Sequence, residues 1–71
     1  MSKYIMNSNA QPTGEHEVHR EATCDHLPDS ENRLLIGYFD SCWSAIRTAK
    51  SKWPNLTIDG CAYCCPECNN G

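Results

Sequence analysis

Residues 61–68, CAYCCPEC, decide the fold of this chain, because they hold four of its six cysteines. Cysteines that serve only as small apolar side chains are usually scattered singly, so this group indicates a metal site or a disulfide framework. The first ten residues, MSKYIMNSNA, lack the apolar core and cleavage pattern of a signal peptide. The sequence therefore predicts a cytoplasmic protein with a zinc–thiolate cluster, and disulfide bonding is the alternative.

The chain length supports a bound metal. A chain of 71 residues buries only roughly 60% of its unfolded surface, so small domains usually need a bound metal ion or disulfides to be stable. A structural zinc contributes on the order of 10 kcal/mol at neutral pH. We expect one zinc-binding domain over residues 1–71, with the first few and the last three residues flexible. No run of 18 apolar residues is present, so no membrane span is predicted.

Short strands and one helix are expected along the chain. Turn residues 12–14 separate two strands and indicate an N-terminal hairpin. Residues 28–32 are polar and without periodicity, which predicts a loop, and residues 59–60 (Asp-Gly) predict a turn. The expected strands are 4–6, 15–20, 34–39 (a buried strand) and 56–58. The fold class is therefore α+β, a small zinc-stabilised domain.

The helix is the clearest element. Asp40 or Ser41 can cap its start, and the residue before Pro54 ends it. An apolar stripe recurs at helical spacing, and basic residues in the second half complement the helix dipole. The stripe consists of Cys42, Ala45, Ile46, Ala49 and Trp53.

Each of two Cys-x-x-Cys pairs can supply two of the four ligands of a zinc ion. Cys61 and Cys64 form one pair, and Cys65 and Cys68 form the other. Two thiolates at this spacing can bind one tetrahedral ion. Because adjacent side chains diverge, Cys64 and Cys65 are not expected to bind the same ion. The spacing does not decide which of the two pairs binds the metal.

Two residues before the cluster are candidates for further zinc ligands. Cys24 is the first candidate, and His19 is an alternate, since neutral imidazole is a normal zinc donor. His16 and His26 are expected at the surface. Residues 16–19, His-Glu-Val-His, do not predict a metalloprotease, because that motif needs two histidines four apart on a helix.

Two side-chain groups on the helix have other expected roles. Cys42 is expected to be a small core residue, with a thiol near the zinc as the alternative. Trp43 lies off the apolar stripe, beside Arg47 and Lys50, and an exposed tryptophan flanked by cations can anchor a partner. The alternative is that Trp43 folds over the hairpin.

The chain resembles the Ada-like metal-binding domains. The resemblance is carried by His19, Cys24, the strand ending at Phe39, residues 40–41 at the helix start, and the closing cysteines. The chain also resembles short uncharacterised bacterial proteins whose pattern is His-Glu-Val-His, a cysteine, Leu-Pro, and Asn-Gly-Cys-x-x-Cys-x-x-x-Cys. That pattern covers residues 4–68. It maps onto residues 16–19, Cys24, residues 27–28, residues 59–61, Cys64 and Cys68.

The resemblance implies a fold and a metal site. Cys65 is outside the bacterial pattern, so the implied zinc ligands are Cys24, Cys61, Cys64 and Cys68, with His19 and Cys65 as alternates. Methyl transfer, known for Ada-like repair domains, is not predicted, because the first ligand position falls on a histidine.

Charge shapes the expected function. The net charge is −3, and four zinc-bound thiolates would take it to about −5, which disfavours binding to a phosphate backbone. We expect a non-enzymatic zinc-binding module that interacts with a protein. The alternatives are a nucleic-acid-associated Ada-like domain using the face of Trp43, Arg47, Lys50 and Lys52, and a thiol redox protein using Cys65.

Overall fold

Two N-terminal strands form the antiparallel hairpin that the sequence predicts. In the computed structural model, which describes residues 1–70, β1 (Ser2–Asn7) pairs with β2 (Glu15–Arg20), and Ile5 lies opposite His19. Gly14 lies in the connecting turn at φ 102°, a conformation that residues with a side chain rarely adopt. The turn therefore depends on glycine at this position.

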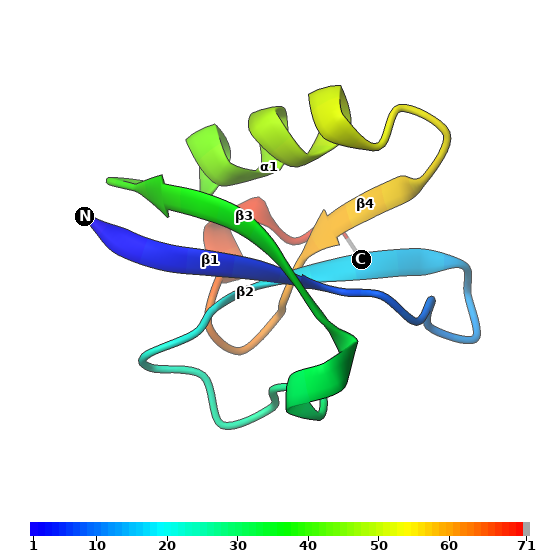
Figure 1. Cartoon of the computed structure of the whole chain (residues 1–71), viewed down its shortest axis with the longest axis horizontal. Coiled ribbons are helices and arrows are strands. Elements are labelled where there is room, and N and C mark those ends of the chain that lie inside the picture. The colour runs from blue at the N-terminus through cyan, green and yellow to red at the C-terminus, as the bar shows by residue number, and fades with distance from the viewer. Residues whose placement is uncertain (71) are drawn as a thin grey trace.

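A mixed sheet extends this hairpin on both sides. β3 (Arg33–Phe39) pairs antiparallel with β1, and β4 (Thr57–Gly60) pairs parallel with β2. The strand order within residues 1–70 is β3-β1-β2-β4, and α1 (Cys42–Lys52) connects the two edge strands (Figure 1). The predicted α+β class, with an N-terminal hairpin, short strands and a central helix, is confirmed.

The helix begins and ends where the sequence predicts. Ser41 is the N-cap, and the amide of Ser44 donates a hydrogen bond to its hydroxyl oxygen at 3.4 Å. The last helical residue is Lys52, so the helix stops before the Trp53–Pro54 pair. The apolar stripe packs on the sheet, and its buried members are Cys42, Ala45, Ile46 and Ala49.

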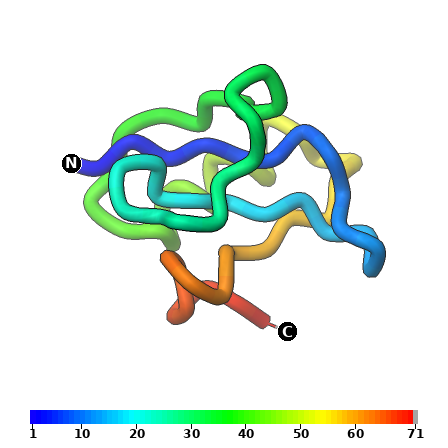
Figure 2. Tube along the Cα trace, turned by 90° about the horizontal axis from the view of Figure 1, so that it is seen from below, coloured from blue at the N-terminus to red at the C-terminus, as the bar shows by residue number. Residues whose placement is uncertain are grey.

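The core lies between α1 and one face of the sheet (Figure 1). Tyr4, Met6 and Val18 contribute to this core from the two central strands. Because side chains alternate along a strand, Ile5 and His19 face the other way. The segment between β2 and β3 passes on that opposite side of the sheet (Figures 1 and 2). The buried histidine therefore lies outside the helix-covered core.

Two local predictions are wrong. β3 is an edge strand rather than a buried one, and Leu35 and Tyr38 are 51% and 57% exposed. A short apolar run does not by itself show how many neighbours a strand has. Asp59 and Gly60 form the end of β4 instead of a turn, and both are buried. The predicted loop over residues 28–32 holds one short 3-10 turn, η1 (Ser30–Asn32).

Residues near both ends of the described chain, 1–70, are bonded to the sheet. β1 begins at Ser2, and Asn69 and Asn70 hydrogen-bond to the last residues of β4. The Nδ2 amide of Asn69 donates to the carbonyl of Gly60 at 2.8 Å, and the Asn70 amide donates to Asp59 at 3.0 Å. Among residues 1–70, no helix has the length and apolar character needed to cross a membrane.

Candidate metal centre

Four donor side chains meet where β2 and β4 end. The two strands are parallel, with Val18 opposite Gly60, so their C-terminal ends lie at the same edge of the sheet. This register places His19 next to Cys61, whose amide donates a hydrogen bond to the Val18 carbonyl at 2.9 Å. Two donors that are far apart in sequence are therefore neighbours because of one strand pairing.

Two tight turns bring the other donors back to this point. After β2, the amide of Cys24 donates to the Arg20 carbonyl at 3.1 Å, which returns Cys24 towards His19. After β4, the amide of Cys65 donates to the Cys61 carbonyl at 2.8 Å, which closes the turn that contains Cys64. We call the segment 61–68 the knuckle.

Three of the six distances between the metal-donor atoms are close to those around a tetrahedral ion. The ligand atoms of His19, Cys24, Cys61 and Cys64 all lie within 4.8 Å of one another. With metal bonds of about 2.3 Å to sulfur and 2.0 Å to nitrogen, a tetrahedron has sulfur–sulfur edges of about 3.8 Å and nitrogen–sulfur edges of about 3.5 Å. The Cys24–Cys61 sulfur distance is 3.8 Å, and His19 Nδ1 lies 3.4 Å from Cys24 Sγ and 3.9 Å from Cys64 Sγ.

Backbone amides support the sulfur atoms. The Arg20 amide donates to Cys64 Sγ at 3.3 Å, and the Tyr63 amide donates to Cys61 Sγ at 3.4 Å. Hydrogen bonds of this kind stabilise a thiolate, which is the form that binds a metal. The side chains that carry the donors are also buried, except that Cys64 is half-buried.

Burial shifts the pKa values of the side chains that could bind the metal. It raises the pKa of the Cys24 and Cys61 thiols, and it lowers the pKa of His19, helped by His26 and Arg33. A lowered pKa keeps the His19 imidazole neutral, which is the form that coordinates a metal. The thiols must lose their protons when a metal binds.

A carboxylate lies on the far side of the histidine ring. Glu17 Oε1 is 3.9 Å from His19 Nε2, while Nδ1 points to the sulfur atoms. A carboxylate at the second ring nitrogen orients metal-binding histidines in many proteins. The ring therefore has one nitrogen towards the sulfur atoms and a carboxylate near the other nitrogen, beyond hydrogen-bond distance.

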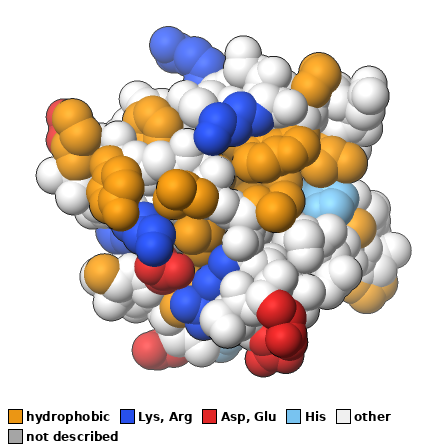
Figure 3. Space-filling model, in the orientation of Figure 1, with side chains coloured by type: hydrophobic (Ala, Val, Ile, Leu, Met, Phe, Trp, Pro, Cys, Tyr) orange, Lys and Arg blue, Asp and Glu red, His pale blue; other side chains and the backbone are white. Residues whose placement is uncertain are grey.

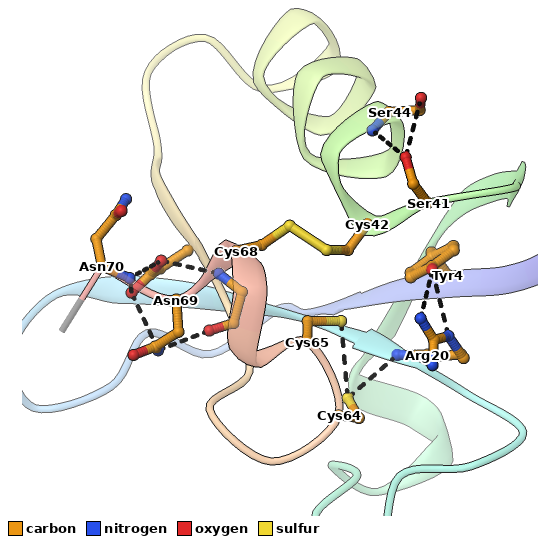
Figure 4. Close-up of a disulfide and its surroundings, with 12 residues drawn as sticks. Tyr4, Arg20, Ser41, Cys42, Ser44, Cys64, Cys65, Cys68, Asn69 and Asn70 are labelled. Carbon is orange, nitrogen blue, oxygen red and sulfur yellow. Dashed lines mark hydrogen bonds between the residues drawn. A yellow bond between two sulfur atoms is a disulfide. The ribbon is translucent and has the colours of Figure 1, made fainter.

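The donor cluster shares three of its four residues with the implied ligand set. Cys24, Cys61 and Cys64 come together as expected, and His19, named as an alternate, is the fourth donor. Cys68 instead forms a disulfide with Cys42 at the start of α1 (Figure 4). The short turn η2 (Pro66–Cys68) carries Cys68 away from the donor cluster and towards the helix.

Cys42 and Cys65 also have defined positions. Cys42 is buried on the apolar stripe as predicted, but its place in the sequence did not indicate the disulfide, because its spacing is that of any core residue. Cys65, the other alternate ligand, is fully buried outside the donor cluster, with its sulfur 3.9 Å from that of Cys64 (Figure 4). Burial, followed by the charge of Cys64, raises the pKa of Cys65 to about 12.

The remaining predicted residues lie apart from the cluster. Trp43, Arg47 and Lys50 gather around one hollow beside α1. His26 is exposed as expected, but its ring stacks on Tyr63 at 3.7 Å between centroids. This contact joins the segment after β2 to the knuckle, and no sequence signal indicated it.

No protein-family model matches this chain, and the comparisons with curated proteins and with solved structures found no match.

Proposed function

We propose that this chain is a small, non-enzymatic zinc-binding module. One observation carries the proposal: one imidazole nitrogen and three thiol sulfurs, from two strand ends and the turns after them, lie within 4.8 Å of one another. A Cys₃His set suits zinc, which is borderline-soft and almost always tetrahedral in structural sites. The ligands are His19, Cys24, Cys61 and Cys64.

The number of protein ligands favours a structural role for the ion. Catalytic zinc sites have three protein ligands and an open position, whereas structural sites are closed by four. Here four protein donors lie together, so an ion bound by all four would have no open position. The zinc would link the end of β2 to the knuckle, which lies at the other end of the sequence and has only short turns of its own.

The spare sulfur atoms support a non-enzymatic role. A catalytic or redox thiol needs an accessible sulfur and a lowered pKa. Cys65 is fully buried and its pKa is raised, and both cysteines of the disulfide are buried as well. The net charge of −3 favours a protein over a nucleic acid as the partner.

Native mass spectrometry of the purified protein tests the zinc proposal, with zinc and free thiols counted in the same sample. We expect one zinc per chain. We also expect a chelator to remove the near-ultraviolet circular dichroism signal, because the fold of a small metal domain depends on its metal. A protein that binds no zinc under reducing conditions, with the three cluster thiols free, would refute the proposal.

A further inference from the structure

A hollow of about 280 Å³ lies beside α1, on the side where the chain returns after β4. One wall comes from the helix, and the other comes from β4, the last residue of the knuckle and Asn70. We call it the α1 groove, and its lining residues are Trp43, Ile46, Arg47, Lys50, Ile58, Cys68 and Asn70. Small-molecule sites usually measure about 300–1,000 Å³, so this groove suits an anchoring side chain of a partner.

The groove has an apolar floor and an aromatic rim. Ile46 and Ile58 belong to the buried core, so only a small part of each side chain faces the groove. Trp43 is 57% exposed, and it is the large exposed apolar residue that lines this groove. A large exposed aromatic residue beside an apolar floor is typical of a binding anchor.

The charge of the groove is opposite to that of the chain. Arg47 and Lys50 line it, and no acidic residue does. Within residues 1–70 neither of these cations forms an ion pair, whereas Lys3 and Arg33 both pair with Glu21. In the view of Figure 3, some basic side chains lie at the top, over α1, and others lie lower on the same face near acidic ones, most of which are in the lower half. An anionic partner would therefore meet a locally positive surface on a protein of net charge −3.

The disulfide joins the two walls of the groove. Cys68 lines one wall and is bonded to Cys42, the first residue of the helix that forms the other. The groove is therefore held in shape without a partner, and a preformed site loses less conformational entropy on binding.

We propose that the α1 groove binds an acidic peptide segment of a protein partner, through one apolar side chain and two or more carboxylates. The apolar side chain would pack on Trp43 and the floor, and the carboxylates would pair with Arg47 and Lys50. This proposal rests on the proposed function, because it assigns a surface to the interaction role.

The observations favour a peptide over the other candidate partners. A nucleic-acid backbone needs a row of cations, and this surface offers two around an apolar floor. A second copy of the chain would bring a net charge of −3 to a molecule of the same charge. An acidic peptide satisfies both the cations and the apolar surface.

An array of capped octapeptides tests the proposal. Each peptide carries Glu or Asp at three or more positions and one Leu, Ile, Phe or Trp, and the matched set carries Lys in place of the acids. Binding of the zinc-loaded protein is measured by fluorescence anisotropy at 50 mM and 300 mM salt, with a single-stranded oligonucleotide as a further probe. We expect acidic peptides with an apolar residue to bind, and to bind less tightly at high salt.

Variants locate the binding surface. Trp43→Ala and the double variant Arg47→Gln with Lys50→Gln should each weaken peptide binding by about tenfold or more. The double variant Asn9→Asp with Ser30→Asp has the same change in net charge at two exposed positions outside the groove, and should bind like the original chain.

The proposal is overturned if no acidic peptide binds, if basic peptides or the oligonucleotide bind more tightly, or if the control variant loses as much affinity as the groove variants. Self-association that Trp43→Ala abolishes would assign the groove to a second copy and would also overturn it. Zinc is counted on every sample, so absence of zinc refutes the metal site, whereas absence of peptide binding by zinc-loaded protein refutes the groove.

Discussion

Adjacent cysteines in the knuckle offer a sharp test of the metal site. Cys64 Sγ lies 3.9 Å from His19 Nδ1 and accepts a hydrogen bond from the Arg20 amide. Cys65 Sγ lies 3.9 Å from Cys64 Sγ, and Cys65 is not a member of the donor cluster. Cys64→Ser should therefore weaken zinc binding strongly, and Cys65→Ser should not.

The magnitude follows from the number of donors. Structural zinc binding contributes about 10–16 kcal/mol at pH 7, and four donors share it, which is about 2.5–4 kcal/mol for each. A serine hydroxyl stays protonated and is a poor zinc ligand. Cys64→Ser should therefore lower the zinc affinity by about 100- to 1,000-fold. Cys65→Ser retains all four donors, so we expect a change of less than about tenfold.

The assay is competition for zinc with a chromophoric chelator at pH 7, on variants whose folding in excess zinc is confirmed by circular dichroism. Cys65→Ala serves as a second control, because a buried hydroxyl at this position costs about 1–3 kcal/mol by itself. If Cys65→Ser and Cys65→Ala release zinc while Cys64→Ser retains it, the donor set derived from the structure is wrong.

Three further perturbations test the surrounding structure. Gly60→Ala would place a Cβ atom 2.8 Å from Cys68 Cβ and should destabilise the fold by about 1–3 kcal/mol, seen as a lower melting temperature, whereas an unchanged melting temperature would contradict this close approach. Replacing Cys42 and Cys68 together by serine opens a link across 26 positions and should cost about 3–4 kcal/mol in chemical denaturation. Zinc content should be unchanged in that variant, so loss of zinc would place the pair in the metal site. Glu21 has a lowered pKa, first through its hydrogen bond with Lys3, so its stabilising effect is present above its unfolded pKa and is lost as the pH falls through its folded pKa. Glu21→Gln should therefore flatten the loss of stability in acid, and an unchanged pH profile of the melting temperature would argue against the ion pair.

Local patterns predicted the secondary structure well. The helix follows from a stripe with a period of 3.6 residues, a serine cap and a proline just beyond its end. The strand over residues 15–20 follows from its own composition and the glycine turn before it. These signals depend on interactions between residues close in sequence, which is why they can be recognised without the fold.

Pairing between distant strands decided what the sequence could not show. The apolar run of β3 looked buried, but its place at the sheet edge depends on which strands pair with β1. Asp59 and Gly60 have turn composition, yet the parallel pairing of β4 with β2 holds them in a strand. Neither outcome is set by the residues in the segment itself.

The cysteine chemistry shows the same division. The sequence by itself determined that residues 61–68 hold a cysteine cluster, and it indicated Cys24 as a candidate for a further sulfur ligand. Only the tertiary structure decided the partners: the β2–β4 register brings His19 to Cys61, and η2 turns Cys68 towards Cys42 on the helix. A Cys-x-x-Cys spacing shows that two thiolates can bind the same ion. It does not show which strand end or helix lies next to those two cysteines in the fold.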